Sequence, residues 1–216
     1  MESMHKHLYI FSGLGADERV FQKLDLSAWD VTFIKWIPQH EDEELKHYAT
    51  RILPQVNTKR PILIGLSFGG IMAIEVAKQI ETERIILISS VKTRFELPYY
   101  YRISGKYGFH RLLPTGLMKK ATLVNYWFFG ARSAFDRRIL KEVLEDTDAG
   151  FFKWAIGKVA TWQQAKKLPN ITHIHGTKDR ILPFRFVQAD HVIKNGGHMM
   201  VLNKAEQLNA LLREHI

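Results

Sequence analysis

Cysteine is absent from the 216 residues, and the sequence is also poor in long apolar runs. Without cysteine the chain forms no disulfide bond and uses no thiolate nucleophile, and this composition is compatible with a reducing compartment. No run approaches the roughly 20 apolar residues of a membrane-spanning helix, and the N-terminal residues MESMHKHLYIFSGLGA lack the apolar core of a signal peptide. These absences favour a cytoplasmic protein without membrane contact.

Linkers, low-complexity tracts and internal repeats are missing as well. The chain is 46% hydrophobic, and 216 residues are enough to bury one continuous core. We therefore expect residues 1–216 to form a single domain.

Acidic residues are outnumbered, because 31 Lys and Arg against 22 Asp and Glu give a formal net charge of +9. The excess points to acidic partners, but no nucleic-acid-binding motif occurs, so we expect no nucleic acid. Many basic residues gather in one segment whose only acids are Glu96 and Asp136. They are Lys92, Arg94, Arg102, Lys106, Arg111, Lys119, Lys120, Arg132, Arg137, Arg138 and Lys141. Two interpretations stay open: a solvated helical face, or a docking surface for an acidic macromolecule.

Short apolar runs alternate with helical patterns along the chain. The predicted strands are His7–Gly13, Val31–Ile37, Ile62–Ser67, Arg84–Ser90, Ile171–Gly176 and Asp190–Gly196. The predicted helices are Asp17–Leu24, Asp42–Leu53, Phe68–Ile80 and Lys204–His215. This alternation predicts an α/β fold, a mostly parallel six-stranded sheet flanked by helices on both faces, with its ligand beyond the carboxyl ends of the strands.

One segment, residues 91–168, breaks the alternation. It is rich in aromatic and basic residues, has helical spacing and contains no good strand. Because it is too long for a connection and too apolar to be disordered, we expect a helical cap over the site. Most of its aromatics should form the core of the cap and a minority should line the pocket: Tyr99, Tyr100, Phe109, Tyr126, Trp127, Phe128, Trp154 and Trp162.

The residues Gly65, Leu66, Ser67, Phe68 and Gly69 form a G-x-S-x-G pattern where a predicted strand turns into a predicted helix. That context is the one a nucleophile elbow requires. A serine nucleophile needs a base and a group that orients the base. Asp179 follows the fifth predicted strand and His198 follows the sixth, so the chain supplies both in the order Ser, Asp, His.

On these motifs, GLSFGG, HGTKDRILP and GGH before a final helix, the sequence resembles the α/β-hydrolase superfamily over nearly its whole length. The resemblance implies Ser67 as nucleophile, His198 as general base and then acid, and Asp179 as the group that holds the imidazole tautomer. It also implies an oxyanion hole made by the backbone N–H groups of Phe68 and Leu14. The chain matches the superfamily from its third strand onward, so its first strand should lie between its second and third.

Other residues compete for these roles. Asp179 itself could be only a loop residue. Asp190 is the main rival acid, but it opens a strand at the wrong end of the sheet, and the loop after the fourth strand offers no acid before Glu96. The histidine pairs, His5 with His7 and His173 with His175, lack nearby ligands at metal-site spacing, so we expect neither a metal nor a cofactor.

In the glycine-rich loop after the first strand, Ser12 and Gly13 stand where the superfamily often has histidine and glycine. The exact position of the Leu14 donor is therefore less firmly implied than that of Phe68.

The function expected from this reading is hydrolysis of a small-molecule carboxylic ester or thioester through an acyl-enzyme. Carbon–carbon hydrolase, lyase or cofactor-free perhydrolase chemistry on the same triad is an alternative, and a non-catalytic ligand-binding protein is another. In its charge alone, the basic cap resembles the caps of esterases that act on acyl groups carried by acidic carrier proteins. If the resemblance holds, an acidic acyl-carrier protein is a partner that docks on the cap. The sequence does not specify the acyl group.

Overall fold

The structure is a computed structural model that describes residues 6–112 and 120–216. His5 and Lys119, which the sequence analysis named, lie outside the described residues. Six strands form one sheet in the order β2-β1-β3-β4-β5-β6, and every neighbouring pair is parallel. They are β1 (His7–Phe11), β2 (Asp30–Ile34), β3 (Ile62–Leu66), β4 (Arg84–Ile88), β5 (Ile171–Gly176) and β6 (His191–Ile193). The predicted fold class is confirmed, and β1 lies between β2 and β3 as expected.

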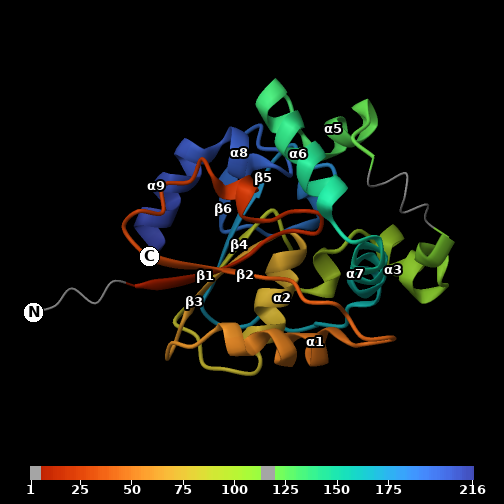
Figure 1. Cartoon of the computed structure of the whole chain (residues 1–216), viewed down its shortest axis with the longest axis horizontal. Coiled ribbons are helices and arrows are strands. Elements are labelled where there is room, and N and C mark those ends of the chain that lie inside the picture. The colour runs from red at the N-terminus through yellow and green to blue at the C-terminus, as the bar shows by residue number, and fades with distance from the viewer. Residues whose placement is uncertain (1–5, 113–119) are drawn as a thin grey trace, which may run out of the picture.

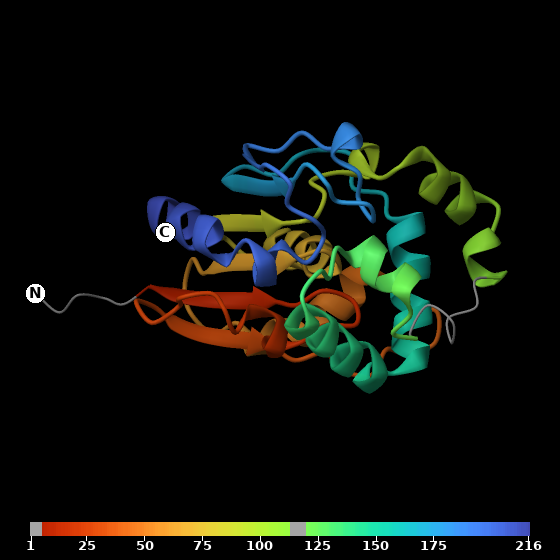
Figure 2. The same cartoon turned by 90° about the horizontal axis from the view of Figure 1, so that it is seen from above.

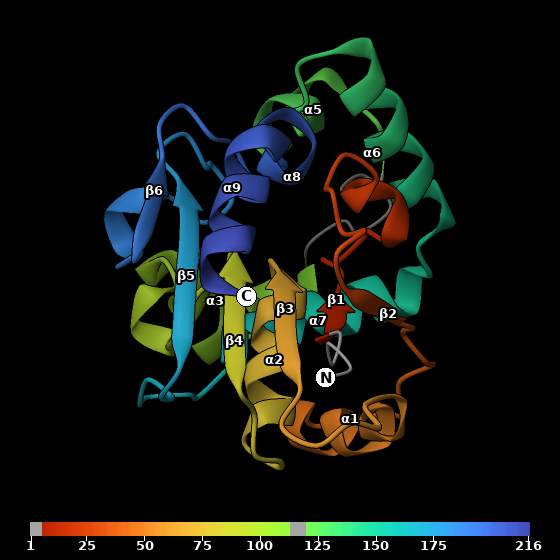
Figure 3. The same ribbon diagram turned by 90° about the vertical axis from the view of Figure 1, so that its left-hand side faces the viewer.

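Helices cover both faces of the sheet because successive strand residues point to opposite sides. Leu8 and Ile10 of β1 pack into one core with η1 (Glu18–Phe21), α6 (Ala134–Asp146), α8 (Met200–Asn203) and α9 (Ala205–His215). Tyr9 and Phe11 pack into a second core with α1 (Leu45–Ile52), α2 (Phe68–Ala77) and α7 (Ala149–Thr161). Figures 1 and 3 show α8 and α9 on the face opposite to α1 and α2.

Several predicted boundaries are wrong in detail. The helix expected at Asp17–Leu24 is a single 3-10 turn, η1, with Asp17 as its N-cap. Helix α1 is followed by a second such turn, η2 (Leu53–Gln55). Strand β6 ends at Ile193 because the chain turns at Asn195, whose φ is +59°. None of the described helices has the length and apolar character needed to cross a bilayer.

The long insertion between β4 and β5 lies at the carboxyl ends of the strands (Figure 2). Its described residues contain no strand and form η3 (Arg94–Glu96), α3 (Tyr99–Lys106), η4 (Phe109–Leu112), α5 (Leu123–Phe129), α6 and α7. Helices α6 and α7 contribute buried side chains to the two cores, whereas α3 and α5 bury none of their residues.

The expectation that the insertion's aromatics would form its own core is therefore wrong for several of them. Trp162 is buried, and Tyr126 and Trp154 are partly buried. The side chains exposed to solvent are those of Tyr99, Tyr100, Phe109, Trp127 and Phe128. For Trp127 and Phe128 the reason is that α5, LVNYWFF, is a short helix with apolar residues on nearly all sides, and such a helix cannot bury every face against a single neighbour.

Candidate active site

Ser67 occupies the sharp turn between β3 and α2, with φ +53° and ψ −121°. This conformation is unfavourable for a residue with a Cβ, so it persists only where neighbours hold it. The Ser67 N–H donates to the Ile88 carbonyl (3.0 Å), and the Ser67 carbonyl accepts from Ser90 Oγ (2.7 Å) and the Gly70 N–H (2.9 Å). The turn therefore presents the Ser67 hydroxyl at the N-terminus of α2.

Glycines allow α2 to approach the strands closely enough to form this turn. A Cβ at Gly65 would lie 2.3 Å from the Gly70 Cα, and a Cβ at Gly69 would lie 2.1 Å from the Phe11 carbonyl oxygen. Both distances are far below van der Waals contact. The glycines of the motif are thus required by packing, independently of any ligand.

His198 joins Ser67 to Asp179, although the three residues come from distant parts of the chain. His198 Nε2 lies 2.8 Å from Ser67 Oγ, and His198 Nδ1 lies 2.8 Å from Asp179 Oδ2. Because an ionised carboxylate only accepts hydrogen bonds, Nδ1 carries the proton and Nε2 accepts the hydrogen bond from the serine hydroxyl. The structure brings together the three residues that the sequence analysis selected.

The loop that carries Asp179 is held by the carboxylate itself. Asp179 Oδ1 accepts hydrogen bonds from the N–H groups of Ile181 and Leu182, each at 2.9 Å, and the side chain is buried. These bonds leave Oδ2 for His198 and fix the direction from which it accepts. An aspartate at this position thus orients the imidazole and shapes its own loop.

His175 supports the same loop from β5. Its Nε2 donates to the Leu182 carbonyl (2.8 Å) and lies 3.5 Å from Asp179 Oδ2, while its Nδ1 lies 3.3 Å from His173 Nε2. Burial lowers the pKa of His175, partly offset by the Asp179 charge, and burial lowers the pKa of His173 well below its usual value. Both imidazoles are therefore neutral. The sequence analysis missed the link from His175 to the acid loop, and the only signal was its position four residues before Asp179.

The rival acids have other partners. Asp190 immediately precedes β6, where its carboxylate accepts from the His173 N–H (2.8 Å) and lies 3.6 Å from Lys92 Nζ. Glu96 is buried, its pKa is raised by burial, and it accepts from the N–H groups of Lys92 and Gln188. Neither carboxylate contacts His198.

The histidine pairs also have structural partners. His7 Nε2 bonds Thr32 Oγ1 at 2.7 Å and its ring stacks on Tyr9. Among the described residues, no group of three or more His, Asp or Glu side chains is placed to hold a metal ion.

Two backbone N–H groups near Ser67 have no acceptor among the described residues. A Cβ on Gly13 would lie 3.4 Å from the Ser67 Cβ, so the loop after β1 passes directly beside the serine. Within the described residues, neither the Leu14 N–H nor the Phe68 N–H donates to a protein acceptor. Both residues line the cavity that Ser67 and His198 also line.

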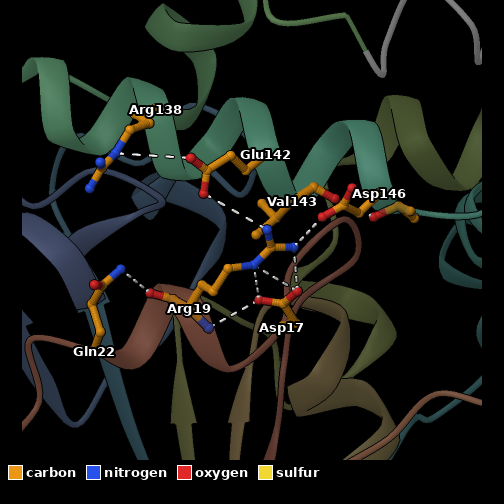
Figure 4. Close-up of polar contacts among 8 residues, drawn as sticks. Asp17, Arg19, Gln22, Arg138, Glu142, Val143 and Asp146 are labelled. Carbon is orange, nitrogen blue, oxygen red and sulfur yellow. Dashed lines mark hydrogen bonds and ion pairs between the residues drawn. The ribbon is translucent and has the colours of Figure 1, made fainter.

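An ion-pair network attaches this loop to α6, as Figure 4 shows. The Arg19 guanidinium lies 2.6 Å from an Asp17 carboxylate oxygen, 2.7 Å from Asp146 and 3.8 Å from Glu142. Burial acts to raise the pKa of Asp17, but the hydrogen bonds and charge of Arg19 outweigh it and hold that pKa below its ordinary value. The network therefore links the loop that carries Leu14 to the insertion.

The cavity over Ser67 has a volume of about 440 Å³ and is lined mainly by apolar side chains of α3, α5 and α7. Among the residues that the structure describes, the polar ones that line it are Ser67, Ser104, Asn125 and His198, and none of the lining residues is a lysine, an arginine or a carboxylate. The lining residues with apolar side chains are Leu14, Phe68, Ile71, Tyr101, Phe128, Phe129, Phe152, Ile156, Val159, Ala160, Ile181 and Leu182. A cavity of this size and character suits an apolar organic group.

A parallel α/β sheet with a serine at a strand–helix turn, beside a histidine and an aspartate, defines the class of protein. The model of the alpha/beta hydrolase family matches residues 11–211. The chain belongs to this family. No curated protein matches it in sequence.

Solved structures share the fold at low sequence identity. A thermophilic esterase from Thermogutta terrifontis is 15% identical with a TM-score of 0.69, covering 97% of this chain and 88% of its own. A carboxylesterase structure from Nitrososphaera gargenis is 16% identical with a TM-score of 0.69, covering 99% and 90%. A meta-cleavage product hydrolase from Pseudomonas fluorescens IP01 is 16% identical with a TM-score of 0.65, covering 97% and 90%. At these identities the likeness shows the fold alone.

Proposed function

We propose that the protein hydrolyses carboxylic esters or thioesters through an acyl-enzyme on Ser67. The observation that carries the proposal is the continuous hydrogen-bonded array from Asp179 through His198 to Ser67 Oγ, opening on an apolar cavity. A non-catalytic binding protein has no need of a buried carboxylate aligned on the second nitrogen of that imidazole. The esterase structures that share the fold are consistent with this choice.

In the proposed reaction, Ser67 Oγ attacks the substrate carbonyl carbon while His198 Nε2 takes the hydroxyl proton. The carbonyl oxygen gains negative charge and accepts hydrogen bonds from the N–H groups of Phe68 and Leu14. His198 then gives its proton to the departing alcohol or thiol, and the acyl group stays on Ser67. A water molecule, deprotonated by His198, releases the carboxylic acid and restores the serine.

The cavity lining specifies the substrate further. Because none of the described residues that line it is a lysine, an arginine or a carboxylate, a charged acyl group would be desolvated there without an opposite charge beside it. We therefore assign an apolar acyl group to the cavity. Carbon–carbon hydrolase, lyase and perhydrolase chemistry remain alternative predictions for the same three residues, and a substrate panel separates them.

The test is a panel of nitrophenyl esters and acyl thioesters of increasing chain length, assayed with wild type and Ser67→Ala. We expect turnover of apolar acyl substrates, and a loss on the order of 10⁴ to 10⁶ in kcat in the variant. Ser27→Ala, a change in a loop away from the cavity, serves as the matched control and should retain wild-type kcat. A folded Ser67→Ala protein with wild-type turnover would exclude the serine mechanism.

A further inference from the structure

Helix α5 exposes an unusual amount of apolar surface. Its sequence is LVNYWFF, and it buries none of its seven residues. Leu123 is 76% exposed, Val124 61%, Trp127 57% and Phe128 41%. Several large apolar side chains exposed on one short helix are typical of an interaction site rather than of an ordinary protein surface.

Helix α3 repeats this arrangement on another wall of the same cavity. Tyr99 and Ile103 are exposed, as is Tyr107 directly after the helix, while Tyr101 and Ser104 of the helix line the cavity. Phe128 of α5 is exposed and also lines the cavity, so it lies at the rim. The exposed apolar side chains therefore stand on two of the helices that enclose the space over Ser67.

The charged residues in the sequence around α3 and α5 are almost all of one sign. From residue 91 to residue 132 the sequence contains a single acid, Glu96, and its side chain is buried. The Arg180 guanidinium lies 4.1 Å from the Trp127 ring centroid and donates to the Trp127 carbonyl (2.9 Å), which holds a positive charge against α5. Lys106 of α3 and Lys120 before α5 add exposed ammonium groups.

We infer that α3 and α5 form a docking surface for an anionic lipid bilayer, from which the enzyme of the proposed function takes its apolar acyl substrate. Side chains of Trp, Tyr and Leu that are flanked by Lys and Arg typically anchor a protein surface among lipid headgroups. A second copy of the chain would bring two positively charged faces together, which charge repulsion opposes. This inference rests on the proposed function for its substrate, but not for the binding itself.

The inference revises the expectation of no membrane contact. That expectation followed from the lack of a membrane-spanning run, but a protein that lies on a bilayer needs only an exposed apolar and basic face. The same surface fits the apolar lining that the described residues give the cavity, because an acyl chain can pass from lipid into it without crossing water.

Vesicle flotation tests the surface directly, using phosphatidylcholine vesicles with and without phosphatidylglycerol. We expect wild type to bind the anionic vesicles more tightly than the neutral ones, and the difference to shrink at high salt. The double substitution Leu123→Gln with Val124→Gln should lower the partition coefficient by at least about tenfold, because both side chains contact lipid in the bound state. The control is Val192→Gln on β6, where an equally apolar side chain is 49% exposed away from the cavity.

Each result of these binding measurements either supports or overturns the lipid-docking surface. The inference would be overturned if the wild type failed to bind anionic vesicles. It would also be overturned if the double variant bound as tightly as the wild type and melted at the same temperature. Binding of an acidic acyl-carrier protein that the double variant loses, without vesicle binding by wild type, would assign the face to a protein instead. Ser67→Ala should bind vesicles as wild type does, so failure of the proposed reaction and failure of the lipid surface are separate results.

Discussion

Ser67 combines an unfavourable backbone conformation with three hydrogen bonds that hold it. Such a conformation costs on the order of 1–3 kcal/mol, so the surrounding contacts must outweigh it. The bonds to Ile88, Ser90 and Gly70 come from the next strand, the loop after it and the first turn of α2. The position of the hydroxyl is therefore fixed before any substrate binds.

Substitutions of two aspartates distinguish the proposed role of Asp179 in catalysis from a merely structural one. Asp179→Asn should lower kcat by about 10⁴, because the amide can donate to His198 and so favour the wrong imidazole tautomer. Asp190→Asn, which changes a carboxylate that bonds the His173 N–H, should alter kcat little. Steady-state kinetics on one ester would measure both, and the reverse ranking would show that the acid is assigned wrongly.

At the residue level, the sequence was sufficient to select Ser67, Asp179 and His198, because each follows a strand and parallel strands end at the same edge. It could not show that His175 bonds Leu182, since that contact depends on how the acid loop turns back over β5. It placed Leu14 beside Ser67 only through resemblance to a family, and the structure shows that Gly13 makes the close approach.

Among the elements, α2 depends most on close backbone packing. Gly69→Ala should destabilise the fold by about 1–3 kcal/mol or more, because the new Cβ would lie 2.1 Å from a backbone oxygen of β1 that cannot move freely. Gly150→Ala on the exposed start of α7 is the matched control, and there the nearest atom is a side-chain oxygen of Asp148 at 3.1 Å. Urea unfolding compares the two, and equal free energies of unfolding would contradict this account of the elbow.

Element types were predictable where the apolar period was regular, as for α2, α9 and the strands. The insertion was harder, because helical spacing alone does not say which face finds a partner. Helices α6 and α7 bury residues in the cores, whereas α3 and α5 turn aromatics to solvent. Apolar content alone does not separate them, because α6 carries many charged residues and still buries one face, whereas α5 carries none and buries no residue.

For the whole molecule, the buried neutral imidazoles make stability depend on pH. Burial lowers the pKa values of His173 and His175, so the unfolded chain takes up protons below about pH 6.5 while the folded chain does not. Stability is therefore full above that pH and falls as the pH decreases, by at most about 1.4 kcal/mol per pH unit for each imidazole.

Urea unfolding between about pH 4.5 and pH 7.5 measures this effect, because the carboxylates with lowered pKa values titrate below that window. Glu96, whose pKa is raised by burial, acts with the opposite sign, so the imidazole contribution is taken from the difference between wild type and a histidine variant. His173→Gln should reduce the slope of the unfolding free energy against pH by up to about 1.4 kcal/mol per pH unit, which corresponds to the uptake of one proton. A slope identical to that of the wild type would mean that His173 is not neutral in the folded protein.

The net charge of +9 is distributed unevenly over the molecule. Both acids of the basic segment, Glu96 and Asp136, are buried, but so is Lys92. On α6, Arg138 and Lys141 pair with Glu142 and Glu145. Lys106 of α3 and Lys120 before α5 are exposed and form no ion pair with the described residues, so they remain as unneutralised positive charges beside these helices.

The central claim is that Ser67 is an activated nucleophile, and covalent labelling tests it most directly. Wild-type protein treated with a fluorophosphonate probe should gain a single adduct, which peptide mass spectrometry locates on Ser67. Ser67→Ala should gain none, and His198→Gln should react far more slowly because the base is lost. An unlabelled wild-type protein, or an adduct on a different residue that persists in Ser67→Ala, would contradict the account.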